Sequence, residues 1–489
     1  MTTHEQPYSE LRRRLAEVDD LRKAAWVLQW DLETMMPPAG AQVRAEQLGT
    51  LAGLAHERFT AEELGELLEE LRGYENDLDY ESDEASIIRV ARRDYERARR
   101  VPTELRAEMV RAGAHGHHEW LRAREANDYE VFRPALERNV ELRRRYVDCL
   151  DGNGDPYDVL VADYEPGLTT ADIAAAFERL SDGLTPLVAD LEPLDEGPFD
   201  LALSDAERRD AVAKVLAGLG FQREWGRFDT SVHPFMINFG TGDIRLTVYE
   251  QGDLRALYAA LHEFGHGIYE RGVDPALERT LLASGASGAL HESQSLLWEN
   301  FVGRSRPFCG WLAGTLGGVD PESLYRAANR FERSLIRVDA DPVTYSLHIV
   351  VRFELERELV SGALAPADLR DAWNALVADH LGLSVPDDLR GVLQDMHWSN
   401  GMIGYFPSYA LGHVASAQIW ERVRADLPEL EEQIGRGEFG PLTEWLREHV
   451  HRHGRKFTTP ETLERVVGGG FDPDPLLRHV RRKLEPLAS

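Results

Sequence analysis

Residues 261–266 read Leu-His-Glu-Phe-Gly-His and contain the pattern H-E-x-x-H. Side chains four residues apart on an α-helix lie on one face, so His262 and His266 can direct imidazole nitrogens at one metal ion. Glu263, which follows the first histidine, can reach a water bound to that metal and act as its general base. The pattern therefore predicts hydrolytic chemistry at a metal centre, with zinc as the metal that these ligands favour.

The pattern alone does not exclude a simpler interpretation, in which the two histidines are hydrogen-bonded in a protein core. The surrounding sequence distinguishes this from a metal site. Leu254, Leu257 and Leu261 recur with helical spacing, which predicts an amphipathic helix that leads into the motif. Gly265 and Gly267 are poor helix formers. Glycines at these positions would allow another backbone to approach closely, which a metal site can require and plain core packing does not. The context favours the metal site.

Composition limits the classes of function. The chain has 489 residues, 43% of them hydrophobic, and a net charge of -30, which argues against nucleic acid as a partner. Its two cysteines, Cys149 and Cys309, offer neither a disulfide framework nor a cysteine zinc site. Residues 1–5 lack the basic and apolar regions of a signal peptide, and no apolar run reaches the ~18 residues of a membrane span. We expect a cytoplasmic protein.

The elements that must position the motif are mostly helical. Residues 8–73 and 80–150 show helical patterns, and the chain is helical again from residue 272 to its end. Residues 232–239 and 244–249 instead favour strands joined by a turn, and they predict a small antiparallel hairpin just before the metal helix. No linker marks a domain boundary. We therefore expect one mainly α-helical domain, residues 1–489, with a small β element beside the site.

A catalytic zinc needs a third protein ligand and an open position for water. Residues 291–294, His-Glu-Ser-Gln, follow a segment rich in glycine and serine and begin a second predicted helix. Both His291 and Glu292 are ligand types, and their position in the sequence leaves the choice between them open.

Further motifs in chain order accompany the two metal segments. They are Trp30-Asp31 with Met36-Pro37, Tyr-Glu-Pro-Gly at 164–167, D-x-R-x-T at 243–247, I-R-x-x-A-D at 336–341 and G-x-x-Q-D-x-H-W at 391–398. In this combination, and over nearly the whole chain, the sequence resembles the M32 metallocarboxypeptidases, the Taq carboxypeptidase family. No departure from the family pattern occurs at the metal positions.

The resemblance implies a fold, an activity and a ligand set. The fold would be the helical zinc-peptidase (gluzincin) fold, with two helical halves around a deep cleft. The third ligand would be Glu292, with His291 ranked second. The enzyme would release single residues from the free C-terminus of peptides with broad specificity, as a homodimer, using zinc, with cobalt or manganese as possible substitutes.

Two further sets of residues follow from the expected reaction. The tetrahedral oxyanion needs donors besides the metal, and Tyr405 and His397 lie at spacings similar to those of donors in related helical peptidases, with Tyr409 a weaker alternative. A free carboxylate suits the planar fork of arginine. The candidates, which the sequence does not rank securely, are Arg352, Arg337 and Arg245.

Two alternatives stay open at this stage. A zinc oligopeptidase that cuts inside short peptides would share the same site and differ only in how the groove closes. A helical binding protein could retain the metal and lack catalysis, in which case Glu263 would have no chemical role.

Overall fold

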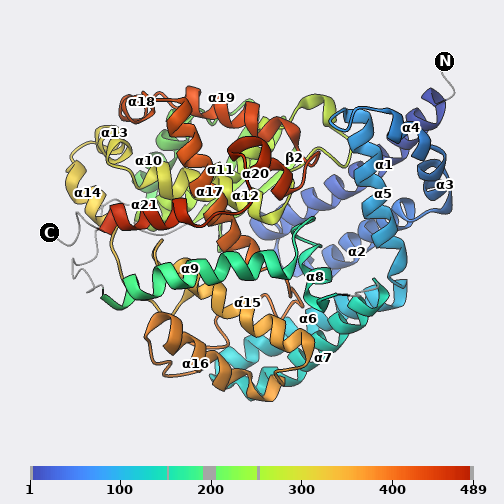
Figure 1. Cartoon of the computed structure of the whole chain (residues 1–489), viewed down its shortest axis with the longest axis horizontal. Helices are drawn as coiled ribbons and strands as arrows, with labels where there is room; N and C mark the ends of the chain where they lie inside the picture. The colour runs from blue at the N-terminus through green and yellow to red at the C-terminus, as the bar shows by residue number, and fades with distance from the viewer. Residues whose placement is uncertain (1–3, 151–153, 191–204, 250–253, 485–489) are drawn as a thin grey trace.

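The computed structural model describes residues 4–150, 154–190, 205–249 and 254–484, which form 21 α-helices and three β-strands. The first five helices form the right-hand part of the molecule in Figure 1. They are α1 (Glu5–Thr34), α2 (Ala41–Phe59), α3 (Glu62–Glu70), α4 (Arg72–Asp77) and α5 (Asp83–Arg100). The side chain of Ser82 accepts a hydrogen bond from the Ala85 amide, which caps the start of α5.

Two larger groups of helices make up the rest, one above the other in Figure 1. The lower group contains α6 (Thr103–Ala126), α7 (Tyr129–Cys149), α8 (Pro156–Val161), α9 (Thr170–Asp190), α15 (Tyr345–Ser361) and α16 (Leu369–Leu381). The upper group contains α10 (Asp205–Gly218), α11 (Leu254–Gly272), α12 (Gly288–Leu296), α13 (Arg306–Leu316), α14 (Pro321–Ala328), α17 (Pro407–Asp426), α18 (Leu430–Arg436), α19 (Gly440–His449), α20 (Thr459–Val467) and α21 (Asp474–Leu484). Packing of α15 on α17 and of α9 on α21 joins the groups.

One stretch between α12 and α13 is a wider helix. Residues Leu297–Gly303, labelled η3, continue α12 directly as a π-helical segment. Such segments are rare and occur often at functional sites. Short 3-10 turns occur at Pro38–Gly40 (η1), Pro275–Leu277 (η2), Arg337–Asp339 (η4), Pro366–Asp368 (η5) and His451–His453 (η6).

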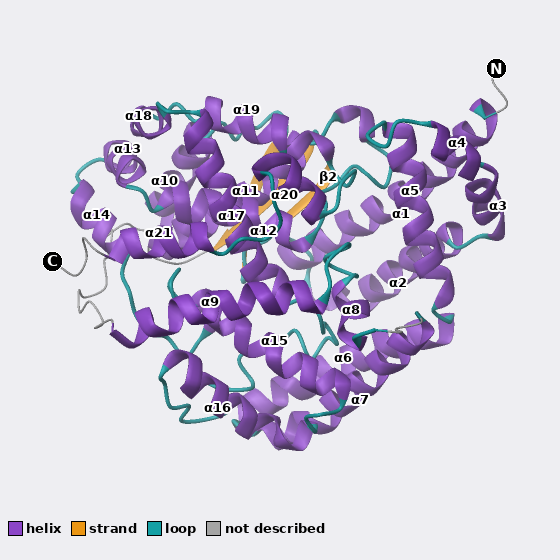
Figure 2. Ribbon diagram, in the orientation of Figure 1, coloured by secondary structure: helices purple, strands orange, loops and turns teal. Residues whose placement is uncertain are grey.

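The strands β1 (Gly226–Ser231), β2 (Met236–Gly240) and β3 (Asp243–Tyr249) form one sheet in the order β1-β3-β2 beside α11 (Figure 2). The predicted antiparallel hairpin is confirmed by β2 and β3, although β2 begins later than expected. β1, which the sequence pattern did not predict, pairs parallel with β3, so the sheet is mixed. The buried side chains of β3 include Ile244 and Leu246, which lie against α11 at Gly267.

The buried hydrophobic side chains form two clusters. The larger one extends through both helix groups and surrounds α11, α12 and α17. The smaller one joins α1, α3 and α5 to residues of the segment that follows α11, among them Val273, Leu277 and Leu281. The N-terminal helices are therefore anchored on the chain that continues directly from the metal motif. The mainly α-helical class with two helical halves is confirmed, and no described helix is long and apolar enough to cross a membrane.

Candidate metal centre

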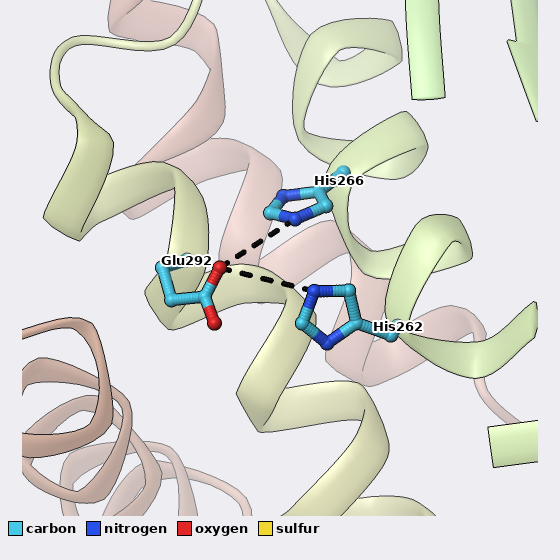
Figure 3. Close-up of side chains that lie close together, drawn as sticks. All are labelled: His262, His266 and Glu292. Carbon is cyan, nitrogen blue, oxygen red and sulfur yellow. Dashed lines mark ion pairs between the residues drawn. The ribbon is translucent and has the colours of Figure 1, made fainter. Parts of the chain in front are cut away.

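His262, His266 and Glu292 lie together at the crossing of α11 and α12 (Figure 3). Both histidines direct Nε2 at the same oxygen, Glu292 Oε2, at 3.8 Å from His262 and 3.7 Å from His266. The three ligand atoms lie within 4.8 Å of one another, and within the described part of the chain no other group of histidine, cysteine and acidic side chains has this geometry. A cation between them would have two nitrogen ligands and one carboxylate.

Two glycines allow this convergence. A Cβ on Gly265 of α11 would lie 2.5 Å from the carbonyl oxygen of Gln294 and 2.6 Å from Cα of Ser295, both in the backbone of α12. A Cβ on Gly412 of α17 would lie 2.6 Å from Cβ of Glu292. The close approach suggested by the sequence therefore occurs at Gly265, and α12 packs closely on α11 at Gly265 and on α17 at Gly412.

The second nitrogen of each histidine has its own partner. Nδ1 of His262 lies 3.0 Å from Oε2 of Glu299, a residue of η3 whose other oxygen accepts from Arg304 at 2.7 Å. Nδ1 of His266 lies 3.1 Å from the carbonyl oxygen of His291. Acceptors at Nδ1 keep one ring proton there, which leaves Nε2 as the nitrogen that would bind a metal.

The charges at this centre also fit a cation. Burial opposes a charge on His262, but the carboxylates of Glu292 and Glu299 raise its pKa to about 10. Burial raises the pKa of Glu263 to about 7, and the nearby carboxylate of Glu292 adds to this effect. Carboxylates that stabilise a protonated imidazole in this way also stabilise a metal cation in the same place. The donor set and its charge therefore fit a divalent metal ion.

His291, the competing ligand in the sequence analysis, lies on the other side of His266. Its Nδ1 is 2.6 Å from Nδ1 of His266, and its Nε2 is 2.9 Å from Oε1 of Glu270. Its ring therefore contacts the nitrogen of His266 that faces away from Glu292. This geometry places Glu292, and not His291, among the three clustered ligand atoms.

The predicted oxyanion donors lie next to one another. Nε2 of His397 is 3.3 Å from the hydroxyl of Tyr409, and the ring of Tyr405 stacks on His397 with centroids 5.7 Å apart. Burial lowers the pKa of His397 to about 4, so its imidazole is neutral at pH 7. The neighbouring Tyr409 and burial raise the pKa of Tyr405, and burial raises the pKa of Tyr409 to about 12; the carboxylate of Glu292 adds to both rises.

The predicted carboxylate-binding arginines differ in what they contact. Arg352 is fully buried, and its nitrogens bind Asp395, Gln394 and the carbonyl of His348. Arg337 binds the other oxygen of Asp395 through Nε and Nη2, at 2.9 and 2.8 Å. Burial alone would raise the pKa of Asp395, but the two guanidinium groups hold it well below its usual value. The structure therefore gives Arg352 a structural partner on every side.

Arg337 has a different position. Among the described residues, no acceptor faces its Nη1, and its charge is close enough to Glu292 to oppose the rise in pKa that burial causes there. Arg245 of β3 instead pairs with Asp243 at 2.9 Å and stacks on Trp30 of α1, 4.7 Å from the ring centre. The structure thus places Arg337 beside Asp395 and the ring of Tyr409, with a charge that acts on Glu292, and it places Arg245 against α1.

Sequence reasoning missed three residues that support the centre. Glu299 lies seven residues after Glu292, and Glu270 lies four residues after His266, on the face of α11 that carries both histidines. The helical spacing of Glu270 could have indicated it. Glu165 was quoted only as part of a motif, yet its buried carboxylate accepts from the Ala289 amide and holds the start of α12.

Comparison with known proteins agrees with this geometry. The family model described as Carboxypeptidase Taq (M32) metallopeptidase matches residues 10–484. The chain is 37% identical over 510 residues to thermostable carboxypeptidase 1 of Thermus thermophilus, with 99% of each chain covered. It is 36% identical over 474 residues to thermostable carboxypeptidase 1 of Pyrococcus furiosus, with 94% of each covered.

Solved structures agree as well. An M32 carboxypeptidase from Deinococcus radiodurans superposes with a TM-score of 0.93 at 38% identity, covering 99% of both chains. A Pyrococcus furiosus carboxypeptidase superposes with a TM-score of 0.94 at 33% identity, covering 98% of this chain and 99% of the other. The chain therefore belongs to the Taq carboxypeptidase (M32) family of metallopeptidases, and it is a metallocarboxypeptidase.

Proposed function

We propose that this enzyme is a zinc-dependent carboxypeptidase that releases single residues, with broad side-chain tolerance, from the free C-terminus of peptides. The observation that carries the proposal is the convergence of His262, His266 and Glu292 next to the buried acid Glu263. Two imidazoles and one carboxylate are the ligands of catalytic zinc in many peptidases. Cobalt or manganese would fit the same donors.

A divalent ion bound by these residues would polarise the scissile carbonyl and increase the acidity of the attacking water. Glu263 then takes a proton from that water and delivers it to the leaving amine. Its burial beside the cluster excludes bulk water from the proton transfer. Glu299 and the carbonyl of His291 keep the two ligand rings oriented throughout.

The tyrosine hydroxyls and His397 provide donors for the negative charge that develops on the carbonyl oxygen. We propose Tyr405 and His397 in this role, with Tyr409 as the neighbour that both contact. Because these rings touch one another, a change at Tyr409 alters the donors even when Tyr405 is intact.

Recognition of the terminal carboxylate is the step that makes the enzyme an exopeptidase. Of the three arginines singled out by the sequence, we propose Arg337, because Asp395 fixes one edge of its guanidinium and leaves Nη1 for a ligand. Arg352 supports it from behind through the same carboxylate. Arg245 is the remaining candidate and lies against α1.

Blocked peptides test the activity against the oligopeptidase alternative. A peptide with a free C-terminus should lose residues one at a time, and its C-terminally amidated twin should survive. Cleavage of the amidated peptide at internal bonds would overturn the carboxypeptidase proposal in favour of an endopeptidase. Elemental analysis of the purified protein identifies the metal.

Two further proposals rest on family resemblance and composition. We propose that the enzyme is a homodimer, which light scattering tests through the molar mass. We also propose that it acts in the cytoplasm on peptides and binds neither nucleic acid nor membranes. Cell fractionation with an antibody against the native chain would check the location.

A further inference from the structure

Three side chains form a continuous polar chain behind the metal cluster. His266 and Glu270 lie one turn apart on α11, and His291 at the start of α12 lies between them. The rings of His266 and His291 have centroids 4.6 Å apart, with their Nδ1 atoms separated by 2.6 Å. Nε2 of His291 continues the chain to Oε1 of Glu270 at 2.9 Å.

We propose that His291 and Glu270 form a positioning relay that holds the ring of His266 and increases its strength as a metal ligand. The inference rests on the proposed metal site and names two residues that act through His266 without touching the metal. In this relay, Nε2–H of His291 donates to Glu270, so Nδ1 of His291 is free to accept. Nδ1–H of His266 is then shared between that nitrogen and the carbonyl oxygen of His291, 3.1 Å away.

The relay gives the two metal histidines different supports. His262 donates directly to the carboxylate of Glu299. His266 reaches a carboxylate only through a second imidazole. Electron density that a carboxylate adds to one end of such a hydrogen-bonded chain makes the far nitrogen a better ligand, and this is how outer partners tune metal sites. Without Glu270, only neutral groups, the carbonyl and the imidazole of His291, would orient His266.

The surroundings of the relay leave its groups little freedom. Glu270 is 4% exposed, and besides His291 it accepts from the Gly285 amide at 3.0 Å and the Ser284 hydroxyl at 3.2 Å. A Cβ on Gly285 would lie 2.6 Å from Cδ2 of His291, so this glycine lets the loop close over the imidazole. The relay is therefore held by backbone contacts from both sides.

The hydrogen bonds from Gly285 and Ser284 alone do not require a charged acceptor at Glu270. An ionised carboxylate in the interior costs more free energy than a well-packed apolar side chain of similar size. Glu270 also lines a cavity of about 320 Å³ with Lys23 and Glu278, and it faces His291 from the side opposite to the metal. Glu270 thus places a buried carboxylate at a position that connects to His266 through His291.

The experiment measures metal affinity by competition with a chelator, using zinc and cobalt, on the full-length protein. Glu270→Gln keeps an acceptor for His291 and removes the charge, whereas His291→Phe removes the relay and keeps the carbonyl contact. We expect each to weaken metal binding by about 10- to 100-fold, the usual effect of losing an outer partner. Glu278→Gln, in the same cavity but without contact to His291, should bind metal like the wild type.

The double variant Glu270→Gln/His291→Phe distinguishes a relay from two independent effects. If Glu270 acts only through His291, the metal affinity of the double variant equals that of the single variant with the lower affinity. The absorption spectrum of bound cobalt should also shift in both single variants and stay constant in Glu278→Gln. His291→Gln replaces His291→Phe if the melting temperature of the metal-free protein shows that the latter does not fold.

Each other outcome overturns the inference. Variants that fold and bind both metals within about twofold of the wild type would show that the relay does not tune His266, as would losses that simply add in the double variant. A wild type that binds no metal would overturn the proposed function itself. Normal binding by the wild type with normal binding by the variants would overturn the relay alone.

Discussion

Gly412 of α17 lies so close to Glu292 that a Cβ there would come within 2.6 Å of Cβ of the glutamate and 2.7 Å of its Cγ. Gly412→Ala should therefore push the carboxylate away from the two imidazoles. We expect weaker metal binding and lower activity, measured by chelator competition and peptide hydrolysis. Gly310→Ala on α13 is the matched control, because a Cβ added at Gly310 would meet no atom within 4 Å. It should gain up to about 1 kcal/mol of stability, as alanine does in exposed helices. Normal metal binding by Gly412→Ala would contradict the proposed packing.

Glu263→Gln should separate metal binding from catalysis. The amide cannot take a proton from water, so we expect a loss of about 10²- to 10⁴-fold in kcat, typical of a lost general base. Metal content should stay the same, because His262, His266 and Glu292 are intact. Elemental analysis and initial rates on one peptide provide both numbers. An active Glu263→Gln enzyme would remove Glu263 from the mechanism.

The two arginines that share Asp395 should respond differently to substitution. Arg337→Ala should reduce kcat/KM for peptides with a free C-terminus by about 2–5 kcal/mol in transition-state terms, because the substrate carboxylate loses its partner. Arg337→Lys should recover part of the loss. Both variants break a buried ion pair with Asp395 and should lower the free energy of unfolding by about 3–5 kcal/mol, but Arg352→Ala should change KM less. Equal effects of both alanine variants on KM would refute this division of roles.

Removal of the metal should inactivate the enzyme and reduce its stability. Binding to the folded state alone adds about 2.7 kcal/mol when the free ion is at 100 times its Kd. Dialysis against a chelator should therefore lower the melting temperature, and zinc should restore both the melting temperature and activity. His262→Ala provides the control, because its melting temperature should no longer respond to zinc.

The free energy of unfolding should fall as pH rises, because Glu165 loses its proton. Burial raises the pKa of this carboxyl to about 7, in spite of hydrogen bonds from Ser408 and Ala289. The folded protein therefore keeps a proton that the unfolded chain has released, so the contribution is greatest below about pH 4.5 and is lost as pH approaches 7. The size is on the order of 3 kcal/mol.

Glu165→Gln removes this titration. Urea unfolding at pH 5 and pH 7.5 should show the variant gaining stability relative to the wild type as pH rises. Glu141→Gln, a change at an exposed residue of α7, should leave the pH dependence unaltered. A wild type whose stability rises over this range beyond the rise in the glutamine variant would reverse the predicted sign.

The sequence predicted the helical class, the metal motif and the β2–β3 hairpin, because each depends on local spacing. β1 escaped detection because its residues, Gly-Arg-Phe-Asp-Thr-Ser, have a weak strand pattern and gain their hydrogen bonds only from β3. The sequence also did not indicate which arginine is free to bind the substrate carboxylate. Arg337 and Arg352 come from different elements, and only the fold shows that one carboxylate, Asp395, occupies both.

The sequence did not indicate Glu299 and Glu270 as partners of the metal histidines for a related reason. Glu299 meets His262 because α12 continues into the wider turns of η3, and no residue in that segment identifies a π-helix by its type alone. Glu270 carries a spacing signal, but its significance depends on the ring of His291, which belongs to another helix.

The direct continuation of α12 into η3 means that Glu292 and Glu299 belong to one rod, while His262, Glu263 and His266 belong to another. Any displacement of either rod as a whole moves its functional groups in concert. The distances from the two imidazoles to Glu292 therefore depend on the separation of the two helix axes. Gly265 lets one backbone rest on the other, so a single added methyl group there would move Glu292 away from both imidazoles at once.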